Sequence, residues 1–492
     1  MRPFNASLGN ALGVMLAMLV GVTACGAPAL VKTREGAFEQ AVSSLALKRP
    51  VVALRGAHRY LVGVGPDDPR YDRAYRVMAQ AAEAIGLRYA ASIWYLQIAQ
   101  GGRDPAMLPF AIEGLMRLIE SGPHDQDLIV SGYLAAADLA ALPASTMAFV
   151  DYHAGLDSLR RGESAWAEQR FARVPRQSPY HWRVRYAQAV AMVARGELDA
   201  AQAALEALLV AANDPNREPS LVADLPGDVH TETLRTLARL HFEGRRWELA
   251  LGLYDQVRAR IPTDPTLLLE MAWTHFYSGS TRRALGLLVA LDAPDHASLI
   301  APERYLLEAM ALRRLCQFEP ARRAALRLRE RYADVFTGIE SGAPLTAIPG
   351  LVAGADRDPA VAPLATLEAS LRRELALVDE LGDRLEPELR TTLDALYGRG
   401  LTDIGRRKSA LAARASERLA DDLLSARDDV RFATHELAVA LLRGRQRPEG
   451  PRERDPGGLG PTSGRVVYRF VDEFWNDELD DLIVLAEDRC IE

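Results

Sequence analysis

A motif of small residues recurs at an interval of about 34 residues over 148–335, apart from one insertion at Asn213 to Asp228 between the second and third copies. This spacing constrains the fold more than any other feature of the chain. Gly196 follows Gly162 at the same interval at which Ala284 follows Ala250. Apolar positions around them follow the three- and four-residue period of a helix. A unit of this length predicts a pair of antiparallel helices, which buries its apolar face only by stacking on neighbouring units.

Four copies of the motif are regular and a fifth is looser. The positions that define them are, in chain order, Gly155, Gly162, Ala167 and Phe171; Ala189, Gly196, Ala201 and Leu205; Ala238, Trp247, Ala250 and Tyr254; Ala272, Gly279, Ala284 and Leu288; and Ala309, Phe318, Ala321 and Leu328. This pattern resembles the tetratricopeptide repeat (TPR), in which small residues let the two helices of each hairpin touch. The resemblance implies a curved TPR-like solenoid over 148–335 that binds other proteins.

The same resemblance implies a concave groove lined by the first helix of each repeat. The register places seven candidate partner-binding side chains there: Tyr152, Arg160, Tyr186, Arg235, Arg239, Trp273 and Tyr277. Aromatic side chains and arginines are enriched at the energetic centres of protein interfaces, because rings bury area and guanidinium groups pair with carboxylates. The alternative is that several of these side chains pack between repeats, and for Trp273 both interpretations stay open.

The N-terminal segment indicates where the chain resides. Val22-Thr23-Ala24-Cys25 follows an uncharged stretch from Leu8 to Val22, and it resembles the lipobox at which bacteria cleave lipoprotein precursors. The resemblance implies removal of a signal peptide, residues 1–24, and lipidation of Cys25. Since no Asp follows the cysteine, it also implies a lipid anchor in the outer membrane with the body facing the periplasm; the inner membrane and the cell surface are the alternatives.

Two other interpretations of this segment are an ordinary secretory signal and a transmembrane anchor. The apolar run is shorter than the roughly 20 residues that a membrane-spanning helix needs, which counts against the anchor. A secretory signal is cleaved after a similar small residue, so the pattern leaves that alternative open.

Composition divides the rest of the chain into further segments. The sequence predicts a tether with little regular structure over 25–70, N-terminal helical hairpins over 71–147 that are candidates for degenerate repeats, a Pro/Gly-rich linker over 336–363, a long helical hairpin over 364–442, a disordered linker over 443–464 and an acidic and aromatic tail over 465–492. The predicted fold class is therefore all-α: a TPR-like helical-hairpin solenoid, then a long helical hairpin and a short irregular or β-type C-terminal tail.

The long hairpin and the tail each allow two roles. Pro387 and the Gly398–Gly400 pair interrupt the apolar period, so the second helix of the hairpin is expected from Asp403 to Leu442. This hairpin caps the solenoid or presents a surface to a partner. The tail motif Phe474-Trp475-Asn476-Asp477-Glu478-Leu479 resembles the C-termini of repeat lipoproteins in bacterial gliding-motility machinery; it folds back on the body or serves as a peptide-like ligand.

Two cysteines remain once Cys25 is assigned to lipid. Cys316 and Cys490 could form a disulfide in an oxidising envelope compartment and so staple the tail to the helical body. The alternative is that Cys316 is a buried apolar residue and Cys490 a free thiol. Sequence spacing does not decide between them, because a disulfide requires the two Cα atoms to lie within about 7 Å.

The sequence contains no recognisable motif for catalysis, phosphate binding or metal binding. Gly460-Pro461-Thr462-Ser463-Gly464 has no Lys after it, His435-Glu436 lacks a second His four residues on, and the acidic tail lacks the ligand spacing of a calcium loop. Because acidic and basic residues are interspersed and the net charge is -7, the sequence predicts no positively charged surface that would bind nucleic acid. We therefore expect no catalytic residue, metal or cofactor.

The expected function is a membrane-anchored scaffold that binds other envelope proteins or peptides through the concave groove. Two alternatives belong to other classes of protein. One is a periplasmic chaperone-like factor for outer-membrane assembly, which would bind extended peptides with weak sequence preference. The other is a regulator of cell-wall enzymes.

Overall fold

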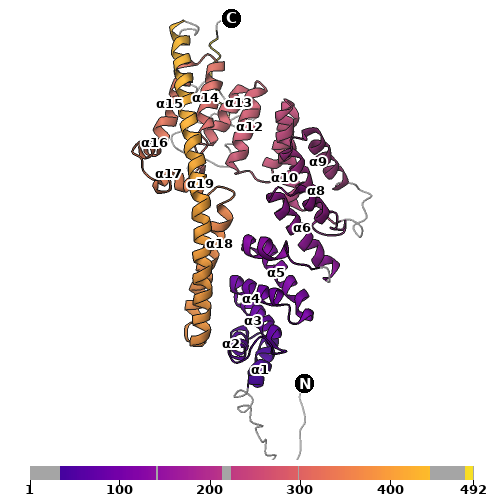
Figure 1. The fold of residues 1–492 in the computed structure, drawn as a ribbon. Coiled ribbons are helices and arrows are strands. Elements are labelled where there is room, and N and C mark those ends of the chain that lie inside the picture. Colours follow the sequence, from indigo (N-terminus) through magenta and orange to yellow (C-terminus); the bar gives the residue numbers. More distant parts are fainter. Residues whose placement is uncertain (1–33, 140–141, 213–222, 297–298, 444–482, 491–492) are drawn as a thin grey trace, which may run out of the picture.

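The computed structural model describes residues 34–139, 142–212, 223–296, 299–443 and 483–490. Within these ranges the chain is built from helices and forms no strand (Figure 1). None of these helices is both long enough and apolar enough to cross a bilayer. The signal segment, Cys25, residues 444–464 of the predicted linker and the tail motif 474–479 lie outside the described residues.

Two helical hairpins precede the predicted repeats. They are α1 (Arg34–Ala46) with α2 (Pro50–Val62) and α3 (Tyr71–Ile85) with α4 (Arg88–Gly101); η2 (Pro105–Met107), α5 (Leu108–Ser121) and the π-helix η3 (Asp127–Leu134) follow. The predicted tether over 25–70 is therefore wrong for residues 34–62. Pro50 does not prevent regular structure, because it lies in the first turn of α2, where a missing N–H removes no intrahelical hydrogen bond.

The repeat region forms five sequential hairpins. They are α6 (Ala144–Arg160) with α7 (Ser164–Phe171), α8 (His181–Ala194) with α9 (Leu198–Ala212), α10 (Gly227–Glu243) with α11 (Trp247–Arg258), α12 (Pro265–Tyr277) with α13 (Thr281–Ala290), and α14 (Glu303–Arg314) with α15 (Phe318–Arg331). The short helix η4 (Pro294–His296) joins the last two hairpins. These hairpins confirm the predicted all-α class and its TPR-like architecture.

The small residues of the motif lie where the helices of these hairpins meet. The alanines that the structure leaves with no exposed surface include Ala167, Ala189, Ala201, Ala238, Ala250, Ala272, Ala284 and Ala321. A methyl group at these positions keeps two helix backbones close, and bulky neighbours such as Phe171 and Tyr254 fill the adjacent core. The constant spacing of the motif therefore reflects a packing requirement that each hairpin repeats.

Each hairpin turns through one residue in the left-handed region within two residues of the end of its first helix. These residues are Lys48, Gly86, Gly162, Gly196, Arg245, Gly279 and Cys316. In six of these turns the next residue donates its N–H to a carbonyl of the last helical turn, as Glu163 does to Ser158 at 2.8 Å, a common way to end a helix. Because α1–α2 and α3–α4 share this turn with the repeats, the array of hairpins begins before residue 71.

The predicted linker over 336–363 is also largely helical. It contains most of α16 (Ala333–Glu340), η5 (Leu345–Ala347), α17 (Pro349–Ala355) and the start of α18 (Ala362–Leu381). Pro349 lies in the first turn of α17, where proline is tolerated. The prediction of a plain linker is therefore wrong. The helix α17 and the short turn η5 pack against α19, and α16 packs against α15 and α17.

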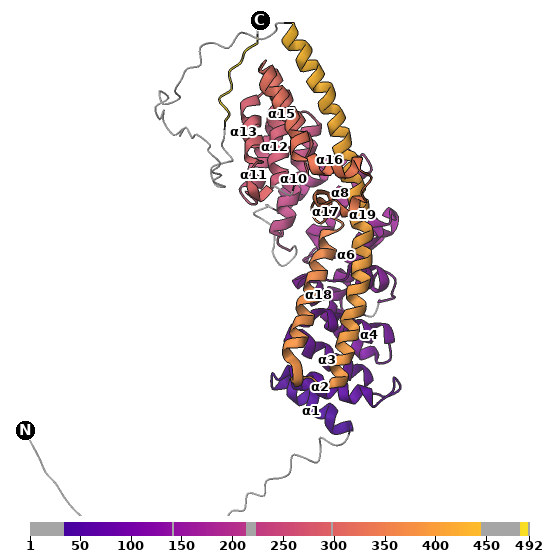
Figure 2. The ribbon, with the colours of Figure 1, turned by 90° about the vertical axis from the view of Figure 1, so that its left-hand side faces the viewer.

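The long hairpin that was predicted over 364–442 is present, with a longer second helix than expected. A short turn, η6 (Gly382–Arg384), joins α18 to α19 (Pro387–Leu442), which has 56 residues. In both views α19 runs along the length of the molecule, from the level of α2 to beyond α15 (Figures 1 and 2). It contacts α2 and α4 at one end of the array and α14 and α15 at the other.

Gly400 lies inside α19 and does not interrupt it, contrary to the sequence-based prediction. A Cβ atom on Gly400 would lie 2.6 Å from the ring of Tyr89 on α4, which is too close for any real side chain. The glycine therefore serves a close approach between α19 and α4, and the neighbouring helical turns supply the hydrogen bonds that keep α19 continuous.

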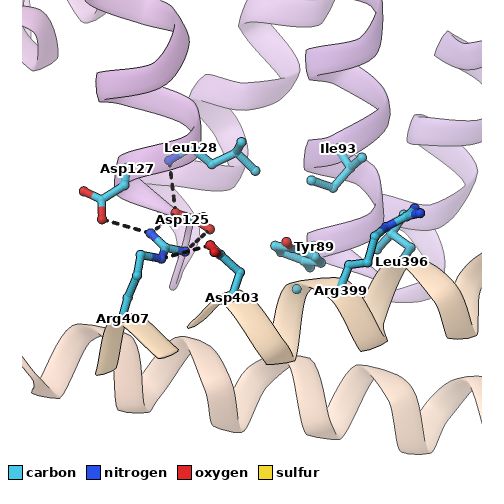
Figure 3. A pocket seen from close by; sticks show the side chains of 10 residues that line it. Tyr89, Ile93, Asp125, Asp127, Leu128, Leu396, Arg399, Asp403 and Arg407 are labelled. Carbon is cyan, nitrogen blue, oxygen red and sulfur yellow. Dashed lines mark hydrogen bonds and ion pairs between the residues drawn. The ribbon is translucent and has the colours of Figure 1, made fainter. Parts of the chain in front are cut away.

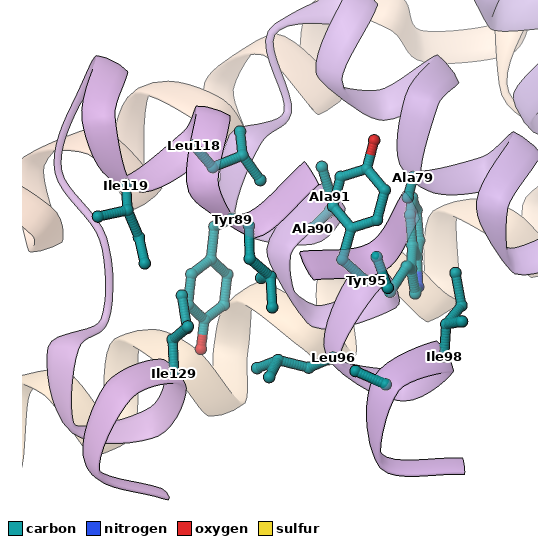
Figure 4. Close-up of a cluster of buried hydrophobic side chains, with 14 of the residues drawn as sticks. Ala79, Tyr89, Ala90, Ala91, Tyr95, Leu96, Ile98, Leu118, Ile119 and Ile129 are labelled. Atoms are coloured by element: carbon teal, nitrogen blue, oxygen red, sulfur yellow. The ribbon is translucent and has the colours of Figure 1, made fainter. Parts of the chain in front are cut away.

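One hydrophobic core unites the N-terminal hairpins with α18 and α19. Tyr89, Ile98 and Ile129 belong to it (Figure 4), as do Leu371 of α18 and Leu393 of α19. The long hairpin therefore does not only cap the last repeat. It shares its main core with the opposite end of the array.

Glu374 of α18 is a buried carboxylate in this core. Its Oε2 accepts a hydrogen bond from the backbone N–H of Tyr89 at 2.9 Å and another from the hydroxyl of Tyr397 at 2.8 Å. Burial raises the pKa of Glu374. Three helices, α4, α18 and α19, therefore meet at one acceptor.

The described end of the tail is irregular and lies across the turns of the last two repeats. The Val484 N–H donates to the Arg282 carbonyl at 3.2 Å, and the Arg489 N–H donates to the Leu315 carbonyl at 3.0 Å. Cys490 and Cys316 form a disulfide, with Cα atoms 5.0 Å apart. The structure thus joins the tail to the turn of the fifth repeat hairpin.

We expect Glu374→Leu to destabilise the protein by at least about 1–3 kcal/mol, because it leaves buried donors of Tyr89 and Tyr397 without an acceptor. Glu374→Gln keeps an acceptor oxygen in the same place and serves as the matched control. Urea denaturation of both variants and the parent protein measures the difference. Equal losses in the two variants would contradict the role of the acceptor.

The same pair of proteins tests the raised pKa. A carboxyl whose folded-state pKa is raised stabilises the fold below its unfolded-state pKa, and this contribution is lost as the pH rises through the folded-state value. We therefore expect the stability of Glu374→Gln, relative to the parent, to improve between pH 4 and pH 7. A constant difference over that range would show that Glu374 has an ordinary pKa.

Candidate protein-binding groove

A concave groove lies across the first helices of the first three repeats, α6, α8 and α10, and encloses a cavity of about 610 Å³. We call it the α6–α8–α10 groove. Its lining residues are Tyr152, Leu156, Leu159, Arg160, Gly162, Ser164, Arg183, Tyr186, Ala187, Val190, Ala191, Ala194, Arg195, Asp228, Val229 and Glu232. The volume lies within the range of about 300–1,000 Å³ that is typical of ligand sites in proteins.

The floor of the groove is apolar. Leu156 and Leu159 of α6 face it from one side, and Val190, with 39% of its surface exposed, lies on α8. Ala187, Ala191 and Ala194 share the same side of α8, since residues three and four apart lie on one helix face. An exposed apolar surface in a concave site favours a partner that removes it from water.

Two tyrosines are held rigidly in the wall. The ring of Tyr152 stacks on that of Tyr180, with centroids 5.1 Å apart and planes 22° apart. The hydroxyl of Tyr186 is hydrogen-bonded to Thr236 Oγ1 at 3.1 Å. Burial raises the pKa of both Tyr152 and Tyr186, so they stay neutral at physiological pH.

Next to Tyr152, the ring of His153 also packs in this aromatic cluster, 4.9 Å from the Tyr152 ring centroid. Burial lowers the pKa of His153 to about 4, so the imidazole is uncharged at neutral pH. The rings of Tyr180 and His153 behind Tyr152 are therefore aromatic and uncharged.

Charged side chains form the rim. Arg160 donates to Asp157 at 2.8 Å and Arg195 to Glu197 at 2.8 Å, and neither carboxylate lines the groove. At the other end of α8, Arg183 pairs with Asp228 at 2.7 Å. These pairs are partly exposed, so each contributes little to stability and leaves donors for a partner.

The groove contains three of the seven side chains that the sequence assigned to it: Tyr152, Arg160 and Tyr186. Arg235 lies elsewhere and is mostly buried. It donates to Asp264 at 2.7 Å and to Glu270 at 3.0 Å, and both carboxylates belong to the next repeat. The assignment of Arg235 to a binding surface is therefore wrong, because the residue fastens the third repeat to the fourth.

Arg239, one turn further along α10, is more exposed and shares the same carboxylate. It donates to Glu270 at 2.6 Å. Together with Arg235 it forms an ion-pair network between repeats, and it is not among the residues that line the α6–α8–α10 groove.

Trp273 and Tyr277 belong to a separate aromatic stack. Tyr277, which is 47% exposed, lies between Trp247 at 5.3 Å and Trp273 at 5.9 Å, measured between ring centroids. Trp273 is partly buried against the core of the later repeats, and Phe276 beside it is buried. Trp273 therefore packs between repeats and supports an exposed tyrosine, and its role in partner binding stays a prediction.

A second cavity, of about 410 Å³, lies where α19 crosses α4 and the start of η3 (Figure 3). Arg407 of α19 donates to both carboxylate oxygens of Asp125, at 2.9 and 2.6 Å, and to Asp127 at 2.9 Å. These hydrogen bonds to Asp125 raise the pKa of Arg407. Sequence analysis does not reveal this contact, because Arg407 lies 280 or more residues away from the two aspartates in the chain.

In the described part of the chain, no group of three or more His, Cys, Asp or Glu side chains is arranged to hold a metal ion. The second cavity lies at a contact between helices, and Arg407 in its lining already pairs with Asp125 and Asp403. The α6–α8–α10 groove, with its open apolar floor, is therefore the better candidate for a binding site.

Comparison with known proteins adds a weak similarity. A solved tetratricopeptide repeat protein from Parabacteroides merdae resembles this chain at 12% sequence identity and a TM-score of 0.26, over 61% of this chain and 92% of that one. No family model and no curated protein matches the chain. The repeat architecture therefore rests on the hairpins of this chain itself.

We expect Arg235→Ala to lower the free energy of unfolding by about 1–3 kcal/mol, because the partly buried Asp264 loses its hydrogen bond to Arg235, whereas Glu270 keeps its ion pair with Arg239. Arg160→Ala is the matched control, since Arg160 is half-exposed and its partner Asp157 keeps Arg161 and Ser131, and a change within about 0.5 kcal/mol is expected. Chemical denaturation measures both. A stable Arg235→Ala protein would return this residue to the list of candidate partner-binding side chains.

Proposed function

We propose that this chain is a non-enzymatic, lipid-anchored scaffold of a bacterial envelope complex and that it binds another protein through the α6–α8–α10 groove. The observation that carries the proposal is the groove itself. It combines an apolar floor, rigid tyrosines and arginines on one concave surface of a helical-repeat array. This composition is typical of protein interfaces, in which aromatic residues and arginine are enriched.

The anchoring part of the proposal depends on the lipobox-like Val22-Thr23-Ala24-Cys25 segment. A triacylated cysteine supplies several acyl chains, and attachment that uses more than one chain is durable. The proposed location is the periplasmic face of the outer membrane. A scaffold held there would concentrate its partner close to the membrane.

We expect Cys25→Ser to move the protein from the membrane fraction to the soluble fraction, because serine cannot carry a thioether-linked lipid. Fractionation of cells that express each variant measures this. Cys490→Ser is the matched control and should stay with the membrane. Soluble wild-type protein would contradict lipid anchoring, and membrane-bound Cys25→Ser would point to an uncleaved anchor.

We expect Val190→Asp to reduce recovery of the partner at least tenfold in affinity purification from native membranes, because it places a charge on the apolar floor of the groove. Val210→Asp, at an exposed position of α9 outside the groove, is the control. Equal recovery with both variants would move the interface elsewhere.

The proteins recovered in this purification also separate the alternatives. One stable partner in a fixed ratio supports a scaffold. Many unfolded outer-membrane proteins would support a chaperone-like assembly factor, and recovery of cell-wall synthases would support a regulator of those enzymes.

A further inference from the structure

The lining of the α6–α8–α10 groove restricts the backbone conformation of what it binds. Its floor is made of Leu, Val and Ala side chains, and no Asn or Gln is among the residues that line it. The hydroxyl of Tyr186 is already hydrogen-bonded to Thr236. The floor therefore offers few partners for the polar groups of a bound backbone.

An extended peptide buried on such a floor would leave N–H and C=O groups without hydrogen bonds, which is costly. A helix satisfies these groups internally and presents only side chains. Ala187, Ala191 and Ala194 form a row of small side chains along α8 that lets another helix approach closely. The groove therefore favours an amphipathic helix over an extended strand.

The rim gives this site a charge polarity. Successive first helices run in the same direction, since one antiparallel helix separates each from the next. Arg160 and Arg195 lie at the C-terminal ends of α6 and α8, whereas Asp228 and Glu232 lie near the N-terminal end of α10. One end of the groove therefore carries arginines, and the other carries Glu232 together with the Arg183–Asp228 ion pair.

We propose that the α6–α8–α10 groove binds an amphipathic helix of a partner protein, with acidic residues at the end that meets Arg160 and Arg195 and a basic residue at the end that meets Glu232. The inference rests on the proposed scaffold function and adds the conformation, charge pattern and orientation of the bound segment. Apolar side chains of that helix, spaced three and four residues apart, would cover Leu156, Leu159 and Val190.

Photocrosslinking in native cells tests this directly. A photoreactive amino acid replaces Val190 in the full-length protein, and mass spectrometry identifies the crosslinked peptide of the partner. We expect one segment with apolar residues at helical spacing and acidic residues toward one end. The same probe at Val210, outside the groove, is the control and should not capture this segment.

The outcomes separate this inference from the scaffold function. A single crosslinked segment rich in Pro or Gly, or with alternating apolar residues, would overturn the helix and leave the scaffold function in place. Many unrelated segments would overturn both and support the chaperone. No capture above the Val210 control would overturn the groove as an interface and so both proposals.

The orientation is tested with a synthetic peptide of the captured segment and the purified protein. By fluorescence polarisation, Arg195→Glu should weaken binding about tenfold, and exchange of the facing acidic residue of the peptide for Lys should restore it. Arg245→Glu, at an exposed hairpin turn outside the groove, should leave the affinity unchanged. Circular dichroism checks that each variant is folded. Stronger binding of the peptide with its charges exchanged end for end would reverse the proposed direction.

Discussion

The whole arrangement depends on the docking of α19 against both ends of the hairpin array. In a stack of repeats each hairpin contacts mainly its neighbours, so small rotations between repeats add up along the array. Here one helix fixes the two ends relative to each other. At one end, Arg55 of α2 forms an ion pair at 3.3 Å with Glu386, the N-cap residue of α19. At the other end, Arg313 of α14 forms an ion pair at 2.6 Å with Glu436 of α19. The repeats between them are therefore part of a closed structure.

This closure is held by several kinds of interaction at the N-terminal end. The buried carboxylate of Glu374 joins three helices, Gly400 allows the ring of Tyr89 to touch α19, and Arg407 meets Asp125. Each depends on the others for geometry, because the hydrogen bonds need the close helix approach that the glycine permits. At the other end, Leu437 of α19 packs on Phe318, and the disulfide holds the tail on the neighbouring turn.

For a binding surface, the consequence is preorganisation. The α6–α8–α10 groove lies between the two tied ends, and its tyrosines are already fixed by Tyr180 and Thr236. A rigid groove loses little conformational entropy when a partner binds, so more of the contact energy appears as affinity. Ion pairs such as that of Arg235 with Glu270 also make the array more rigid, because they connect one repeat to the next.

The sequence alone determined the local units of this protein. Small residues at a constant interval dictate helical hairpins, because only a small side chain lets two helices touch, and this period is visible without a structure. What Gly400, Pro50 and Arg235 do was decided only by the tertiary structure. A glycine permits a break or a close approach, a proline ends or begins a helix, and an arginine binds a partner or its own neighbour. Which occurs depends on residues far away in the chain, such as Tyr89 for Gly400 and Glu270 for Arg235.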